Sequence, residues 1–261
     1  MYYKFIGGSE DALLEIFTKA VANGSVKFTP AHSFNDPFEF KFANVAPTRA
    51  TFDRWHSIHA PHRTKDELEN AWRSLSGPAK SYTAAFEPRL QLMKNIYVLC
   101  LAGRWDSHLM WAHYAAEHRG FVICYRPELI TTLAEMPDHA GDGNVTYSDK
   151  VPEMRWFSGD QDAMATAILT TKSSEWTYEQ EYRVLKQGPA GSSAIIRAVD
   201  PNLIAGVILG DRAPDKLAEK ALGLQKTRKD FTVERIGSMS NSYKMIMRRV
   251  EPNVRIFSGS L

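Results

Sequence analysis

Apolar positions along the chain follow the period of a helix in some stretches and the period of a strand in others. Leu13, Leu14, Phe17 and Val21 recur at helical spacing after Ser9, a favourable N-cap, and predict a helix. Short runs rich in β-branched and aromatic residues predict strands at residues 2–6, 26–29, 96–101, 121–125, 145–147, 194–199, 204–209, 231–236, 244–250 and 254–257. Because these strands come in runs and do not alternate strictly with helices, we expect an α+β fold.

A block with a helical pattern separates the early strands from the later ones. It covers residues 46–92 and predicts a helical lobe within a single domain of residues 1–261. His56, His59 and His62 are regularly spaced in this block, but Pro61 breaks the helix that would align them. We therefore expect no metal site at these histidines.

The composition is ordinary for a globular protein, with 44% hydrophobic residues, 24% charged residues and a net charge of +2. A charge this small does not by itself indicate a nucleic acid or membrane partner. Cys100 and Cys124 lie in apolar runs and are expected to be buried free thiols, which suits a reducing compartment. We recognise neither a signal peptide nor an apolar run long enough to span a membrane, so a cytoplasmic location is expected.

Two polar segments with aromatic neighbours are candidates for a binding site. In the first, Asn35 and Asp36 begin an Asn-Asp-Pro turn. It is framed by Phe34, Phe38 and Phe40, which are expected to hold it rigidly on the core. The turn either only reverses the chain or presents Asn35 or Asp36 to a ligand.

The second segment is a helix that is expected to begin after Asp106 or Ser107 and to continue to His118. Trp111, Tyr114 and His118 fall on one face of it. That face is either part of the core, with its polar tips satisfied, or a surface that stacks on a planar ring and bonds its edges.

The most informative stretch is residues 176–185, which is predicted to be a strand. Alternation along a strand puts Glu179, Glu181 and Arg183 on one face and Tyr178 on the other. Carboxylates and a guanidinium in one row are costly to bury unless they are paired or used in chemistry. The row is either a solvated face with an ion pair or a catalytic Glu held by an Arg. The density of aromatic side chains nearby favours the second interpretation.

Several widespread motifs are absent from the sequence. It contains no Gly-x-Gly-x-x-Gly at the start of a helix, no Walker-type loop, no Gly-x-Ser-x-Gly elbow and no His-Glu-x-x-His. The dinucleotide-binding, P-loop, α/β-hydrolase and zinc protease classes are therefore disfavoured.

Three blocks of the sequence resemble the signature blocks of a bacterial family of unknown function. They are Asn-Asp-Pro-Phe-Glu at residues 35–39, Met-Trp-Ala-His-Tyr at residues 110–114 and Tyr-Glu-Gln-Glu-Tyr-Arg at residues 178–183. The chain also begins like that family's Tyr-Lys-Tyr-Arg start, with Phe5 and Ile6 in place of the second Tyr and the Arg. The resemblance implies a distant relationship to ADP-ribosyltransferases, and some members of the family resemble toxins or phage-defence effectors.

This resemblance implies an α+β fold with a split, mostly antiparallel sheet and a helical insertion, and with NAD bound as a substrate in a cleft. Glu181 is implied to stabilise the positive charge that forms on the ribose when nicotinamide leaves. Glu179 is implied to orient or deprotonate the acceptor. The acceptor is expected to be a nucleic acid or a protein, and an antitoxin or immunity protein is an expected partner.

Aromatic, polar and basic residues from all these blocks are implied to bind NAD. Trp111 and Tyr114 would stack on nicotinamide, and Asn35 would bond an amide or ribose edge. Lys4 and Arg183 would meet the pyrophosphate. The full set of implied NAD-binding residues is Tyr3, Lys4, Asn35, Asp36, Trp111, His113, Tyr114, Tyr178 and Arg183.

Two other functions stay open. A non-enzymatic module would bind a nucleotide or nucleic acid through the same aromatic cleft. A metal-dependent nuclease would use Asp36, Glu39 and Glu181, although the spacing of metal ligands is absent. Basic residues near the end of the chain either approach a nucleic acid or form a solvated rim, and they are Lys226, Arg228, Lys229, Arg248, Arg249 and Arg255.

Overall fold

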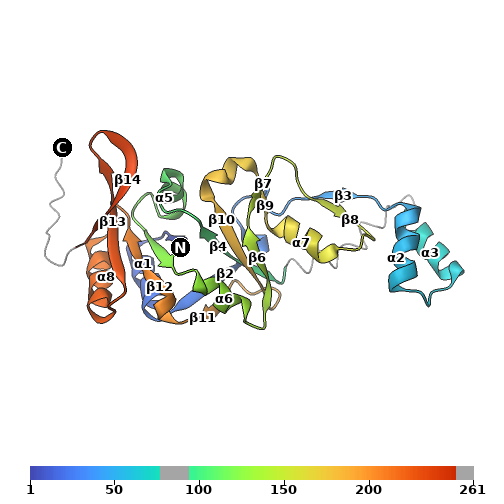
Figure 1. The fold of residues 1–261 in the computed structure, drawn as a ribbon, viewed down its shortest axis with the longest axis horizontal. Coiled ribbons are helices and arrows are strands. Elements are labelled where there is room, and N and C mark those ends of the chain that lie inside the picture. Colours follow the sequence, from blue (N-terminus) through green and yellow to red (C-terminus); the bar gives the residue numbers. More distant parts are fainter. Residues whose placement is uncertain (77–93, 251–261) are drawn as a thin grey trace.

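The fold is built on one large, mostly antiparallel sheet (Figure 1). The computed structural model describes residues 1–76 and 94–250 of the chain. Within these ranges the sheet has ten strands, and only β12 and β13 pair in parallel. The strands are β1 (Tyr2–Ile6), β2 (Ser25–Pro30), β4 (Ile96–Ala102), β5 (Phe121–Tyr125), β6 (His139–Asn144), β10 (Glu181–Gln187), β11 (Ile195–Ala198), β12 (Ile204–Leu209), β13 (Thr232–Met239) and β14 (Ser242–Arg249). The expected mixture of helices with a mostly antiparallel sheet is therefore confirmed.

Helices and short strand pairs surround this sheet. The α-helices of the described ranges are α1 (Glu10–Ile16), α2 (Arg49–His59), α3 (Lys65–Ser76), α5 (His108–Tyr114), α6 (Glu128–Ala134), α7 (Gln161–Leu169) and α8 (Asp215–Thr227). Shorter helical segments are η1 (Phe17–Ala22), η2 (Ala31–Ser33), η4 (Ser174–Glu179) and η5 (Pro201–Leu203). Two parallel strand pairs are β3 (Ala43–Val45) with β8 (Glu153–Arg155), and β7 (Thr146–Tyr147) with β9 (Thr171–Lys172). None of the helices in the described ranges combines the length and apolar character that crossing a membrane requires.

The sequence signals for the first helix are confirmed. The Ser9 side chain accepts a hydrogen bond from the backbone N–H of Ala12 at the N-cap of α1. Phe17 and Val21 are fully buried, although the helix changes into the π-helical segment η1 where these residues lie. The chain then turns at Gly24, whose φ of +68° favours glycine.

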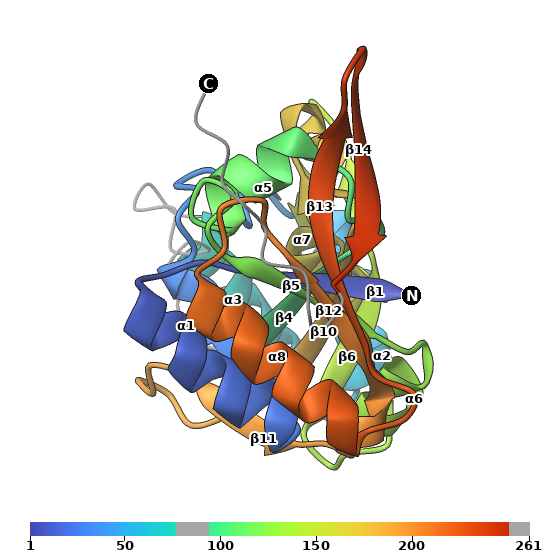
Figure 2. The same ribbon diagram turned by 90° about the vertical axis from the view of Figure 1, so that its left-hand side faces the viewer.

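Both faces of the sheet are covered at β5, which explains why this strand is apolar at every position. Phe121, Ile123 and Tyr125 point into the core cluster shared with α1, α6 and α8. Val122 and Cys124 point the other way, into the cluster shared with α5. Figure 2 shows α1 and α8 together on one side of the central strands and α5 on the other.

The sheet divides at β4. Strand β10 pairs with β4 from end to end, starting with Glu181 opposite Ala102. The opposite edge of β4 is shared, because β2 pairs with it at Tyr97 and Val98 whereas β1 pairs with it at Ala102. From β1 the sheet continues through β5, β12 and β13 to β14, and from β2 it continues to β11. The two branches therefore part along the middle of β4.

The two helices α2 and α3 lie at the far end of the molecule, beyond β3 and β8 (Figure 1). They are joined to the rest by aromatic packing, because Phe157, just after β8, contacts Phe52 of α2 with ring centroids 5.2 Å apart. His56 and His59 also form ring contacts with Trp55. The expected lobe over residues 46–92 is described only up to residue 76; residues 77–93 and the expected strand at 254–257 lie outside the described residues.

The expected strand over residues 176–185 is wrong in its first half. Residues 174–179 form the 3₁₀ helix η4, and β10 begins only at Glu181. Gln180 separates the two elements in the left-handed conformation, with φ of +46°. This turn brings Glu179 and Glu181 into the same region by a route that strand alternation did not predict.

The expected helix over residues 108–118 is also too long. Helix α5 ends at Tyr114, and Ala116, Glu117 and His118 all have positive φ angles. Three such residues in succession cannot continue a right-handed helix. Ser107 is confirmed as the N-cap, since its side chain accepts from the Met110 N–H.

Candidate active site

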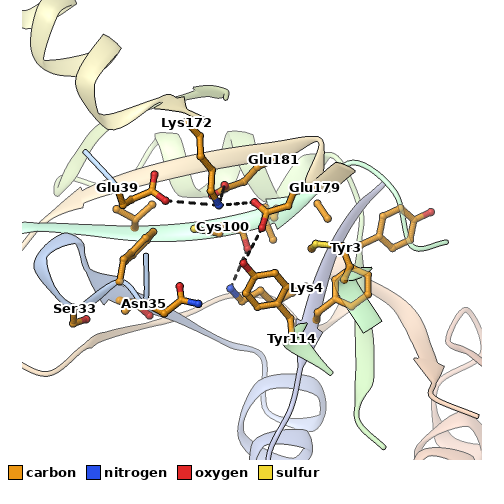
Figure 3. A pocket seen from close by; sticks show the side chains of 17 residues that line it. Tyr3, Lys4, Ser33, Asn35, Glu39, Cys100, Tyr114, Lys172, Glu179 and Glu181 are labelled. Carbon is orange, nitrogen blue, oxygen red and sulfur yellow. Dashed lines mark hydrogen bonds and ion pairs between the residues drawn. The ribbon is translucent and has the colours of Figure 1, made fainter. Parts of the chain in front are cut away.

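A pocket of about 360 Å³ opens where β1 and β2 part along β4 (Figure 3). Strand β1, strand β4, helix α5 and the η4–β10 turn each contribute to its wall. Its charged and hydrogen-bonding side chains include Lys4, Asn35, Tyr114, Lys172, Glu179 and Glu181. Segments far apart in the sequence therefore converge on one polar cavity.

Glu181 is the first residue of β10, and Arg183 fixes its carboxylate. Arg183 Nε donates to Glu181 Oε1 at 2.8 Å, and Nη2 donates to Oε2 at 3.1 Å. Burial alone raises the pKa of Glu181, but the positive charges of Arg183 and Lys172 outweigh burial and hold the pKa at about 2. Glu181 is therefore ionised at neutral pH and is held in the wall of the pocket by two hydrogen bonds from Arg183.

Glu179 lies beside Glu181 in a different electrostatic environment. The Tyr114 hydroxyl donates to Glu179 Oε1 at 2.8 Å, and Lys172 Nζ donates to Oε2 at 2.6 Å. Burial raises the pKa of Glu179, and Lys172 offsets only part of this effect. Two neighbouring carboxylates whose pKa values are pushed apart suit one fixed anion and one proton carrier.

Tyr114 acts as a hydrogen-bond donor in this arrangement. Burial, and then the negative charge of Glu179, raise the pKa of its hydroxyl, which therefore stays protonated at neutral pH. Its position at the last residue of α5 brings the phenol into the pocket while the rest of the helix packs on the sheet. Tyr114 thus orients Glu179 from the opposite wall.

Lys172 is a site residue that sequence reasoning missed. Its Nζ lies 2.6 Å from Glu179, 3.4 Å from Glu181 and 3.7 Å from Glu39, and its side chain is 8% exposed. It also lies over the Trp176 ring, 4.6 Å from the centroid. No motif marks a lysine on the two-residue strand β9. The available signal was the charge balance, because converging buried carboxylates require cations.

Arg183 does not have the role that was expected for it. Its side chain is 0% exposed, and beyond the contacts with Glu181 it donates to the Leu169 carbonyl at 2.6 Å and to Glu39 at 2.7 Å. Because all its guanidinium nitrogens are engaged inside the protein, the prediction that it meets a pyrophosphate is wrong. Arg183 positions Glu181.

The expected stacking role of Trp111 is also wrong. Trp111 is 0% exposed, and its indole N–H donates to the Trp105 carbonyl at 2.7 Å. Its ring packs edge-on against Phe5 within the core. This is the core interpretation of the aromatic helix face, and a ligand cannot reach the ring.

The remaining predicted residues divide between the pocket and its surroundings. Tyr3, Lys4, Asn35 and Tyr114 line the pocket. His113 and Tyr178 lie outside it and contact each other, with His113 Nδ1 3.2 Å from the Tyr178 hydroxyl. Asp36 accepts from the Phe38 N–H at 2.8 Å, which is the turn chemistry that the sequence predicted. Phe38 is 68% exposed and does not hold that turn on the core.

The pocket wall contains a cysteine, Cys100. Burial, and then the charge of Glu181, raise the pKa of the Cys100 thiol in the pocket wall, so the thiol stays protonated and is a poor nucleophile. Among residues 1–76 and 94–250, no group of three or more His, Cys, Asp or Glu side chains is suited to hold a metal ion. The ammonium group of Lys172 lies where the carboxylates converge.

Comparison with known proteins gives one result that bears on the site. A family model described as "Protein of unknown function (DUF2971)" matches residues 110–184. Comparison with curated proteins and with solved structures gives no match. The matched range runs from α5 to β10 and includes Tyr114, Lys172, Glu179, Glu181 and Arg183. The chain therefore matches a family of unknown function over this range. The three signature blocks and the relationship to ADP-ribosyltransferases stay predictions.

Proposed function

We propose that this protein cleaves the bond between nicotinamide and ribose in NAD, as an ADP-ribosyltransferase or an NAD glycohydrolase. One observation carries the proposal. The Glu181 carboxylate is ionised, held rigidly by Arg183 and turned toward a pocket that it shares with Glu179. Such a fixed anion is what a reaction that develops positive charge on a sugar requires.

The chemistry follows from the two carboxylates. The bond between ribose C1′ and the nicotinamide nitrogen breaks, and its electron pair leaves with nicotinamide. Glu181 stabilises the positive charge that builds on the ribose more strongly than it stabilises the ground state. An acceptor oxygen or a water then bonds to C1′ and gives its proton to Glu179.

Lys4 supports binding of the diphosphate. Its Nζ donates to the Cys100 carbonyl at 3.1 Å, and within the described residues it forms no ion pair with a carboxylate. Because Arg183 is buried and Ile6 replaces a basic residue of the resembling family, Lys4 is the cation that we assign to the phosphates. Asn35, which lines the pocket beside Lys4 (Figure 3), is the group that we assign to an amide or ribose edge.

The division of the sheet also supports the proposal. β4 shares one edge between β1 and β2, and the pocket opens where they part. An antiparallel sheet that splits around its substrate cleft is the ADP-ribosyltransferase-like feature that we propose for this fold. A cytoplasmic toxin or defence effector, with a nucleic acid or protein acceptor and a neutralising partner, belongs to the same proposal.

The first test uses the intact protein and NAD alone. The purified chain is incubated with NAD, and the products are separated by chromatography and identified by mass spectrometry. We expect free nicotinamide together with ADP-ribose. Calorimetry with NAD run in parallel distinguishes a binding module, since tight binding without product after long incubation would contradict the enzymatic function.

A further inference from the structure

Lys172 contacts both carboxylates of the proposed reaction, but the steps described above give it no role of its own. Its ammonium group contacts the carboxylates of Glu39, in the turn before β3, of Glu179, at the end of η4, and of Glu181, at the start of β10. Figure 3 shows it between these carboxylates at the wall of the pocket. The contact with Glu179 is the shortest of the three, at 2.6 Å. The Lys172 ammonium therefore lies between Glu179, the proposed proton acceptor, and the fixed carboxylate of Glu181.

We infer that Lys172 is a positioning residue for the reaction: it fixes Glu179 in the pocket and makes its ionised form available while Glu181 stays ionised beside it. This inference rests on the proposed function. Without the ammonium group, an ionised Glu179 would lie next to the Glu181 anion with only the Tyr114 hydroxyl as a donor. Like charges in contact disfavour ionisation, so Glu179 would hold its proton to higher pH and could not accept one from the acceptor.

The pKa of Glu179 is set by groups from several segments packed around it. Lys172 supplies the positive charge that faces it directly. Burial and the Glu181 charge act in the opposite direction, and both raise the pKa of Glu179. The titratable groups that face Glu179 or its lysine are Glu39, Tyr114, Tyr147, Lys172, Tyr178 and Glu181.

A second buried lysine shows that burial by itself does not explain Lys172. Lys186 is 0% exposed, pairs with Asp138 at 2.8 Å and donates to the Leu133 carbonyl at 2.6 Å. It lies on β10 away from the pocket and has one carboxylate partner among the described residues. Lys172 instead faces the cavity with three carboxylate partners, an arrangement that structural anchoring does not require.

The test compares Lys172→Met with Lys172→Arg and with the matched control Lys186→Met. Nicotinamide release is followed across pH, and the acid limb of the profile reports the ionisation of Glu179. Lys172→Met is expected to raise the midpoint of this limb by about one to three pH units. The reason is that removing a neighbouring opposite charge shifts the pKa of a carboxyl group by about that amount. Lys172→Arg is expected to restore most of the wild-type profile. Lys186→Met is expected to lower the free energy of unfolding and to leave the midpoint of the acid limb unchanged.

A second measurement decides the inference without using turnover. The carboxyl carbon of Glu179 and the Nζ of Lys172 are followed by NMR during a pH titration of the wild-type protein. We expect both signals to change with the same midpoint, above the ordinary pKa of 4.5 for a glutamate. Independent midpoints, or an acid limb that Lys172→Met leaves unmoved, would overturn the role of Lys172. A wild-type protein that releases no nicotinamide would instead overturn the proposed function, and the NMR result would still stand.

Discussion

Glu181 and Arg183 form a two-point ion pair along one face of β10, with N–O distances of 2.8 and 3.1 Å. Arg183 is fully buried and also holds Glu39 and the Leu169 carbonyl. The Glu181 carboxylate therefore cannot rotate without breaking a network that is anchored in the core. A planar guanidinium suits this task because its donors match both carboxylate oxygens at once.

Removing the guanidinium is predicted to destabilise the fold strongly. Arg183→Met leaves Glu39 and Glu181 buried without their main partner, and breaking a buried ion pair in this way costs about 3–5 kcal/mol. Urea denaturation measures the change in the free energy of unfolding. Arg197→Met is the matched control, since Arg197 pairs with Asp138 but is 34% exposed, and its loss is expected to cost about 1 kcal/mol or less. Equal losses for the two variants would contradict the structural role given to Arg183.

Trp111 is predicted to affect stability and not ligand binding. Trp111→Phe removes the indole N–H that donates to the half-buried Trp105 carbonyl and leaves part of the buried ring volume empty, a loss of about 1–3 kcal/mol in the free energy of unfolding. Affinity for NAD, measured by calorimetry below the unfolding transition, is expected to be unchanged. Tyr114→Phe is the comparison, because it removes the hydroxyl that contacts Glu179 in the pocket and should affect turnover more than stability. Weakened NAD binding by Trp111→Phe at full stability would revive the stacking role.

Asp138 forms ion pairs with both Lys186 and Arg197. These ion pairs are predicted to make the free energy of unfolding depend on pH. Burial raises the pKa of Asp138, but Lys186 and Arg197 outweigh burial and hold it below the ordinary 3.8. The stabilisation is therefore complete above the unfolded pKa and is lost as the pH falls through the lowered folded pKa. Asp138→Asn is expected to be less stable than wild type by about 3 kcal/mol at neutral pH, because the Lys186 ammonium loses its counter-charge.

Urea denaturation at neutral pH and in increasing acid measures this difference. The two proteins are expected to approach equal stability in strong acid, where Asp138 is protonated in the wild type as well. A difference that stays constant down to the most acidic condition would mean that the charge of Asp138 contributes nothing.

Much of the fold could be predicted from local signals. The first helix followed from the Ser9 cap and the spacing of Leu13, Phe17 and Val21, all of which the structure confirms. Buried strands such as β5 and β12 followed from short apolar runs. The conversion of residues 174–179 into a 3₁₀ helix could not be predicted, because it depends on Gln180 adopting a left-handed conformation that most residues avoid.

The candidate site was predictable only in part. Glu179 and Glu181 stood out because charges amid aromatic residues on an expected strand are unusual. Lys172 was missed because no motif marks it, and the charge balance asks for a cation without saying which lysine or arginine supplies it; the contact with Glu181 arises only in the folded chain. Trp111 and Tyr114 are three residues apart on one helix, yet one is core and the other lines the pocket, a distinction that helical spacing alone cannot make.

In the proposed reaction, the fixed negative charge at Glu181 stabilises a sugar cation. Single-turnover release of nicotinamide, measured at saturating NAD for the wild type and Glu181→Gln, tests it most directly. Unfolding curves and NAD affinity are measured for the same samples, so that a fold defect is recognised. We predict that Glu181→Gln binds NAD and releases nicotinamide slower by about 10²–10³-fold, as expected when one preorganised electrostatic partner of a transition state is lost. A folded Glu181→Gln protein that releases nicotinamide at the wild-type rate would contradict the claim.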